Sequence, residues 1–107
     1  MTDMISRMDH MLSHTDAVIN LMIVDDWYKV NEQLPGLVSE VQEMLMQIIA
    51  AEQVTVDIAK VMDALKRAMN ALNLQDTIQL ADIWRYEILS EMVQWKQSLE
   101  QLQGQEA

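Results

Sequence analysis

The stretch from Asp76 to Leu102 carries the longest uninterrupted helical pattern in the chain, and it constrains the fold more than any other segment. At 100° per residue, one set of its apolar residues falls within about 40° of a single line. This inner stripe comprises Ala81, Trp84, Ile88, Met92, Trp95, Leu99 and Leu102. An outer stripe on roughly the opposite side comprises Ile83, Tyr86, Leu89 and Val93. Because polar residues normally occupy the outside of a bundle helix, we predict that this helix has two faces to bury.

The composition favours helices throughout the chain. Its 107 residues include ten Met but only two Gly and one Pro, which leaves little material for the turns of a sheet protein. The length fits a single domain, residues 1–107. We predict an all-α, antiparallel up-and-down four-helix bundle with helices at about 3–24, 26–51, 56–72 and 76–102.

Polar residues that favour helix ends mark the three connections. The predicted N-caps are Asp25 or Asp26, Thr55, and Asp76 with Gln79 as a capping box, and Asn73 is expected in the left-handed conformation that closes the third helix. A frayed tail is expected from Gln103 onward. A three-helix alternative would fuse the first two helices across the Asp25-Asp26 pair.

The second helix contains the only proline. Its apolar stripe begins at Trp27, a predicted core residue, and keeps one phase across Pro35 and Gly36. Two readings follow, a helix kinked at Pro35 or a short helix that ends at Leu34. The preserved phase favours the kinked helix.

The methionines fall mostly on apolar stripes, which indicates ordinary core filling. In the third helix the predicted core stripe is Ile58, Val61, Met62, Leu65, Met69 and Leu72. The alternative is that flexible thioethers form a surface that repacks against different helical ligands. Met46, which lies off the main stripe of its helix, supports that alternative.

The charge balance points to protein partners. The formal net charge is −10, so the chain repels nucleic acid and anionic lipid surfaces. We expect a partner with a basic or amphipathic helical segment. The absence of cysteine excludes disulfides and thiolate chemistry. No apolar run is long enough to span a membrane and the first ten residues do not resemble a signal peptide, so a cytoplasmic protein is expected.

His10 and His14 are the only histidines, and their i,i+4 spacing would let two imidazoles share a metal ion. A di-metal bundle also needs Glu-x-x-His pairs, and the chain has none. We therefore expect two solvent-facing histidines and no metal or other cofactor. Without a recognisable catalytic motif, we predict that the protein is not an enzyme.

Glu87 lies at the border of the inner stripe. A carboxylate there could pair with Lys29, Lys66 or Arg67 and fix the register of the helices. The alternative is a solvated residue on the flank of the helix.

Two segments resemble a known group of proteins. DDWYKVNEQLPGLVSEVQ and LQDTIQLADIWRYEILSEMVQW, within Asp25–Trp95, resemble small uncharacterised all-helical bacterial proteins of the firmicute type. That resemblance implies no particular activity, and Ser90 stands where the group would have a proline. The size, acidity and helix order are more distantly similar to the flagellar and type III export chaperones FliT and FlgN. This similarity implies a protein that holds helical export substrates.

The functional expectation is a non-enzymatic, protein-binding helical module that acts like an export chaperone. In it, Ile83, Tyr86, Leu89 and Val93 would contact an amphipathic partner helix, while Trp84, Ile88, Met92 and Trp95 hold the bundle together. The first alternative is a structural homodimer that buries the same patch. The second is a metal-binding bundle that uses His10 and His14.

Overall fold

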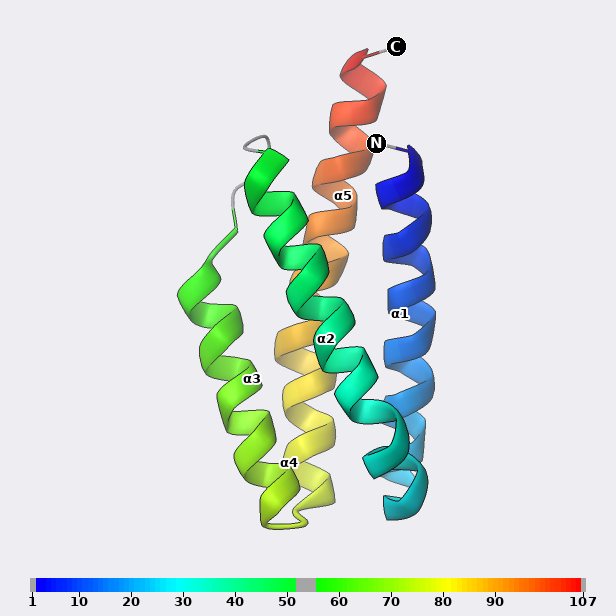
Figure 1. Cartoon of the computed structure of the whole chain (residues 1–107), viewed down its shortest axis with the longest axis vertical. Helices are drawn as coiled ribbons and strands as arrows, with labels where there is room; N and C mark the ends of the chain where they lie inside the picture. The colour runs from blue at the N-terminus through cyan, green and yellow to red at the C-terminus, as the bar shows by residue number, and fades with distance from the viewer. Residues whose placement is uncertain (1, 52–55, 107) are drawn as a thin grey trace.

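The computed structural model describes residues 2–51 and 56–106, and within them every regular element is a helix. The elements are α1 (Thr2–Ile23), α2 (Trp27–Ala51), α3 (Ile58–Asn73), α4 (Thr77–Asp82), the π-helical segment η1 (Ile83–Ile88) and α5 (Leu89–Glu106). The last three follow one another without a break and form one long fourth helix (Figure 1). The predicted all-α four-helix bundle is confirmed.

Aspartates cap three of these helices. The carboxylates of Asp26, Asp57 and Asp76 each accept a hydrogen bond from the backbone N–H three residues later, at 3.2, 3.1 and 3.1 Å. Each carboxylate thereby satisfies one free donor and places negative charge at the positive end of the helix. Asp26 and Asp76 were both predicted as caps. The prediction of Thr55 falls outside the described residues, and α3 begins at Ile58 after its cap, Asp57.

Two helix ends differ from the sequence-based prediction. Asn73 is the last helical residue of α3, and the left-handed position belongs to Gln75, with φ 55°. Asp25 takes the corresponding position after α1, with φ 61°. α5 continues to Glu106 instead of fraying after Leu102, since the glutamines and glutamate of this segment are good helix formers.

The core runs along the axis of the bundle and contains residues of all four helices. Trp84, Ile88, Met92 and Trp95 are at most 2% exposed. Thr15, the one polar interruption of the stripe on α1, is buried and donates a hydrogen bond to the carbonyl of Met11 at 2.7 Å. Trp27 is only partly buried because it is the first residue of α2, at the end of the bundle.

α2 continues through Pro35, so the alternative of a short helix ending at Leu34 is wrong. Pro35 and Gly36 both face solvent, whereas Leu34 and Leu37 on either side are buried. The proline removes one backbone hydrogen bond from the helix. Burial of the flanking leucines stabilises the helical path despite that loss.

The π-helical segment η1 corrects the prediction for Ile83. The backbone N–H of Leu89 bonds to the carbonyl of Trp84, five residues earlier, so this turn holds more residues than an α-turn. The phase of the helix shifts there, and both Ile83 and Trp84 are buried. The fourth helix packs against both α1 and α3. A wider part of its circumference is therefore buried than contact with one neighbour would require.

The helices are packed unevenly around the bundle. α1 packs closely against α2, and the fourth helix packs closely against both α1 and α3. In the described parts of the chain, by contrast, the backbones of α2 and α3 rarely come within 8 Å of each other. Figure 1 shows α3 separated from the lower half of α2. The α2–α3 seam is therefore open, whereas the other three are closed.

Candidate functional site

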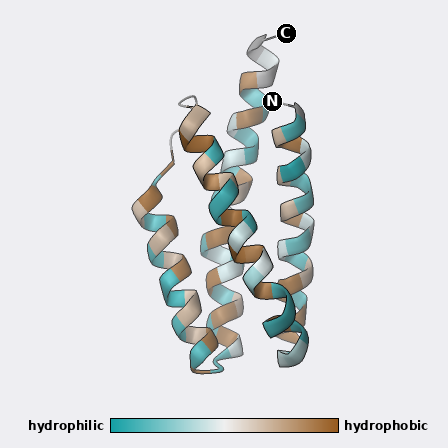
Figure 2. Ribbon diagram, viewed as in Figure 1, coloured by the Kyte–Doolittle hydropathy of each residue, from teal (hydrophilic) through white to brown (hydrophobic). Residues whose placement is uncertain are grey.

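The open seam forms an apolar groove, which we call the α2–α3 groove. One hollow of about 200 Å³ is lined by Leu34, Pro35, Val38, Met69 and Leu72. A second, of about 350 Å³, is lined by Gln42, Leu45, Met46, Ile49, Ile58 and Met62. The two hollows follow one another along the antiparallel helices, and hydrophobic segments recur along both helices in Figure 2. At 1.5 Å per residue the lining spans about 22 Å, the length of roughly four helical turns.

The groove has a buried floor and an exposed apolar rim. Leu34 and Leu45 are buried, whereas Met46, Ile49, Ile58, Met62 and Met69 are between 39% and 70% exposed. Every residue of the lining is uncharged, and Gln42 is its only polar side chain. Large apolar side chains gathered in this way are typical of a surface that binds another protein.

The exposure of Ile58, Met62 and Met69 corrects the predicted core stripe of α3. The buried residues of α3 are Val61, Ala64, Leu65, Ala68 and Ala71. Three of these are alanines, which let α3 lie close against the fourth helix. Ile58, Met62 and Met69, which lie beside this alanine face, are then left in the open seam. The alanines at positions 64, 68 and 71 are the sequence signal that could have revealed the groove.

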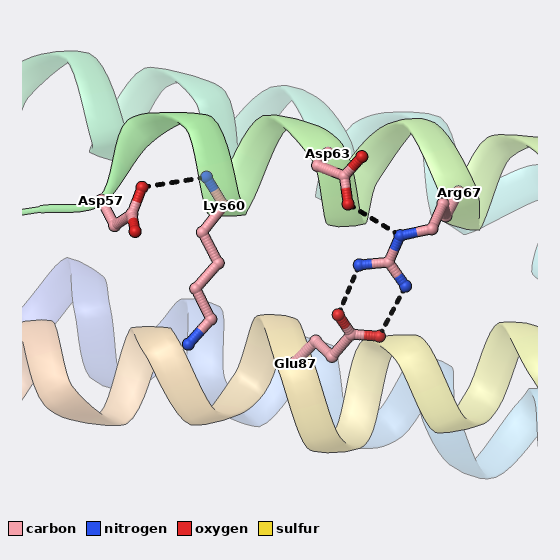
Figure 3. A network of polar contacts seen from close by, with 5 residues as sticks. All are labelled: Asp57, Lys60, Asp63, Arg67 and Glu87. Atoms are coloured by element: carbon pink, nitrogen blue, oxygen red, sulfur yellow. Dashed lines mark hydrogen bonds and ion pairs between the residues drawn. The ribbon is translucent and has the colours of Figure 1, made fainter.

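Ion pairs hold the opposite flank of α3 in place (Figure 3). The Arg67 guanidinium donates two hydrogen bonds to the Glu87 carboxylate, at 2.8 and 2.5 Å, and a third to Asp63 at 2.9 Å. Lys60 Nζ lies 2.9 Å from Glu91 Oε1, and Glu91 is 8% exposed. Of the three predicted partners for Glu87, the structure selects Arg67. These ion pairs fix α3 to the fourth helix. The separation of α3 from α2 is therefore a feature of the packing and does not reflect mobility of α3.

The charges of this network shift the acidity of its members. Hydrogen bonds from Arg67 hold the pKa of the Glu87 carboxyl below its usual value, although partial desolvation opposes the shift. The hydrogen bond to Glu91 raises the pKa of Lys60. The bonds to Glu87 and Asp63 raise the pKa of Arg67. The lowered pKa of Glu87 and the raised pKa of Arg67 keep this pair charged at neutral pH, which suits a structural clamp better than an acid–base catalyst.

The four residues of the predicted partner-binding patch do not form one surface. Ile83 is 4% exposed and belongs to the core, and Leu89 is partly buried. Tyr86 is 66% exposed, and the Arg85 guanidinium lies 6.0 Å from the centre of its ring. Val93 is also exposed. The shift of phase at η1 separates Ile83 from the others, so the patch is discontinuous.

The two histidines have different surroundings on the opposite side of the bundle, where α1 meets α2. His14 is partly buried, and its Nδ1 lies 3.1 Å from Glu40 Oε2. This contact corrects the expectation that it faces solvent, whereas His10 is exposed. Within residues 2–51 and 56–106, no three His, Cys, Asp or Glu side chains come together in a group that could hold a metal ion.

These features define the class of the protein as an all-α four-helix bundle with three closed seams and one open, apolar seam. The chain belongs to the family of the domain of unknown function DUF8042, whose model matches residues 1–98. The matched residues include α1, α2, α3 and most of the fourth helix, and so the whole lining of the groove. Comparisons with curated proteins and with solved structures found no match. No helix in the described parts of the chain has the length and hydrophobicity needed to cross a membrane.

Proposed function

We propose that this protein is a non-enzymatic binding module that holds an amphipathic helix of a partner protein in the α2–α3 groove. The observation that carries the proposal is the uncharged line of half-exposed Met and Ile side chains between two helices whose backbones rarely come within 8 Å of each other in the described residues. An amphipathic helix in the groove would cover these side chains and complete the packing. This is the helix-in-groove mode of recognition.

The shape and composition of the groove fit such a ligand. Its length of about four turns matches a helix of roughly 15 residues. Three of the rim residues are methionines, whose unbranched side chains adapt to different apolar surfaces. A module of this kind could therefore accept several related helices, as an export chaperone of the FliT or FlgN type would require.

The charge of the chain favours a basic partner over a second copy. Two copies would each carry a formal charge of −10 and would repel one another. A helix with lysines or arginines on its polar face would be attracted to the negative net charge of the chain while its apolar face enters the groove. Self-association through the groove is the competing outcome.

The proposal is tested with a fluorescein-labelled synthetic peptide of about 16 residues that has leucines on one helical face and lysines on the other. Fluorescence anisotropy measures its affinity for the protein. We expect Ile49→Glu and Met62→Glu each to raise Kd about tenfold or more, because a charge would be buried against the peptide.

Tyr86→Glu is the matched control, since it adds the same charge on η1, outside the groove. The Kd of this variant should stay within about twofold of the wild-type value, because an exposed charge away from the contact surface contributes little to affinity. If all three variants weaken binding equally, the loss does not depend on the groove, and the proposed groove is wrong. Light scattering that shows a wild-type dimer broken by Met62→Glu would favour the homodimer instead.

A further inference from the structure

Eight of the ten methionines of this chain divide into two groups that differ sharply in exposure. Met46, Met62 and Met69 border the α2–α3 groove and are 70%, 45% and 42% exposed. Five others, Met8, Met11, Met22, Met44 and Met92, are at most 2% exposed. The chain has no cysteine, so these exposed thioethers are the most accessible oxidisable sulfur-containing side chains among the described residues.

We propose that Met46, Met62 and Met69 form a reversible oxidation site at which hydroperoxides lower the affinity of the groove for its helical ligand. In each step the thioether sulfur attacks the outer peroxide oxygen, the O–O bond breaks and the sulfur becomes a sulfoxide. Water leaves when the oxidant is hydrogen peroxide. The sulfur loses two electrons and the peroxide gains them. The effect on binding rests on the proposed function of the groove, whereas the pattern of oxidation does not.

The chemistry of the groove makes it sensitive to this change. A sulfoxide replaces an apolar, flexible group with a polar one that accepts hydrogen bonds. Gln42 is the only side chain of the lining that could donate to it. Burying three sulfoxides against the apolar face of a helix would leave polar oxygens without partners, which opposes binding. Because these three side chains are well exposed before binding, the fold itself tolerates the added oxygen.

Met44 and Met46 provide an internal comparison on one helix. They lie two residues apart on α2, yet Met44 is 2% exposed and Met46 is 70% exposed. Their local sequence is therefore nearly the same, and the difference in exposure comes from the fold. Oxidation of the native protein should discriminate between them, and oxidation of the unfolded chain should not.

The first measurement is peptide-mapping mass spectrometry of the full chain after timed exposure to hydrogen peroxide. We expect Met46 to be oxidised at least about ten times faster than Met44, with Met62 and Met69 close to Met46, because the peroxide must reach the sulfur. The same treatment in guanidinium chloride should remove the difference. Equal rates for Met44 and Met46 in the native protein would overturn the proposed site.

The second measurement repeats the anisotropy titration with the leucine–lysine peptide on oxidised protein. We expect Kd to rise about tenfold or more, and to return after treatment with methionine sulfoxide reductases. The triple variant Met46→Leu/Met62→Leu/Met69→Leu has no oxidisable sulfur on the rim. Its Kd, whatever the starting value, should change by less than about twofold on peroxide treatment, because the remaining described core methionines are protected.

The outcomes separate the two proposals. If untreated protein does not bind the peptide, the proposed function fails and the control of binding fails with it, while the mass spectra still decide whether the oxidation site exists. Selective oxidation with unchanged affinity overturns the control of binding alone. If peroxide treatment lowers the affinity of the triple variant, the sensitive residue lies elsewhere, and this result would also overturn the proposal.

Discussion

Trp84 and Trp95 show how strongly burial of apolar surface dominates this fold at the scale of a residue. Both side chains are at most 2% exposed, and neither indole Nε1–H has a hydrogen-bond partner among the described residues. Leaving such a donor unpaired costs about 1–3 kcal/mol. Each indole also removes roughly 150–250 Å² of surface from water, which contributes more than that cost. The core therefore tolerates two unpaired donors in exchange for two large rings.

We predict that Trp84→Ala and Trp95→Ala each lower the free energy of unfolding by about 3–5 kcal/mol, because each leaves a large cavity in the core. Urea denaturation followed by circular dichroism would measure the change. Tyr86→Ala is the control, and its effect should stay below about 1 kcal/mol since the Tyr86 side chain is mostly exposed. Costs below about 1 kcal/mol for both tryptophans would contradict this description of the core.

At the scale of helices, the pairing of α3 with η1 depends on the ion pair between Arg67 and Glu87. Because the pKa of Glu87 is lower in the folded chain than in the unfolded chain, its charged form stabilises the fold. This contribution is complete above the ordinary carboxyl value of 4.5 and disappears as the pH falls through the lowered pKa. Both side chains are more than a third exposed, so solvent screens the pair and its effect is modest.

We predict that Glu87→Gln lowers the urea midpoint at pH 7 and that the difference from wild type shrinks as the pH is lowered below 4.5. Parallel denaturation series at several pH values would show this. Glu100→Gln is the matched control, because Glu100 is exposed and its nearest cation, Lys96, is 3.8 Å away. A difference between Glu87→Gln and wild type that stays constant down to strongly acidic pH would show that the pair does not contribute through charge.

The middle of α2 carries a glycine that the helix does not require. Gly36 has an ordinary helical backbone without positive φ, and a Cβ added there would meet nothing within 4 Å. We predict that Gly36→Ala raises the free energy of unfolding by about 0.5–1 kcal/mol, because alanine loses less backbone freedom on folding. Gly104→Ala, near the end of α5, should have a smaller effect because helix ends contribute less. Destabilisation by Gly36→Ala in urea denaturation would contradict the continuous helix through Pro35.

The helices could be predicted from sequence because the caps and stripes that define them are local. Asp26 and Asp76 determine two helix starts through contacts within three residues. Ile83 and Met62 could not be placed in this way. Ile83 is buried because a π-turn shifts the phase of the helix, and Met62 is exposed because α2 lies too far from α3 to cover it. Both properties depend on how whole helices pack, which a fixed angle of 100° per residue does not contain.

At the scale of the molecule, the open α2–α3 seam results from the close packing of α3 on the fourth helix and of α2 on α1. Alanines bring α3 close to the fourth helix, and the Arg67–Glu87 pair fixes it there. α2 packs closely against α1 on its own side. The α2–α3 seam is thus left with large apolar side chains and no helix to cover it within the described residues. A stable fold and an exposed apolar groove are consequences of the same arrangement.

The most direct test of the groove is an NMR titration of protein labelled with ¹³C at the methionine methyl groups, using the leucine–lysine peptide as ligand. Single Met→Leu variants assign the signals. If the groove binds an amphipathic helix, the signals of Met46, Met62 and Met69 shift on addition of the peptide while those of Met8 and Met92 stay in place. Shifts confined to methionines away from the groove, or no shifts at peptide concentrations up to about 1 mM, would contradict the account.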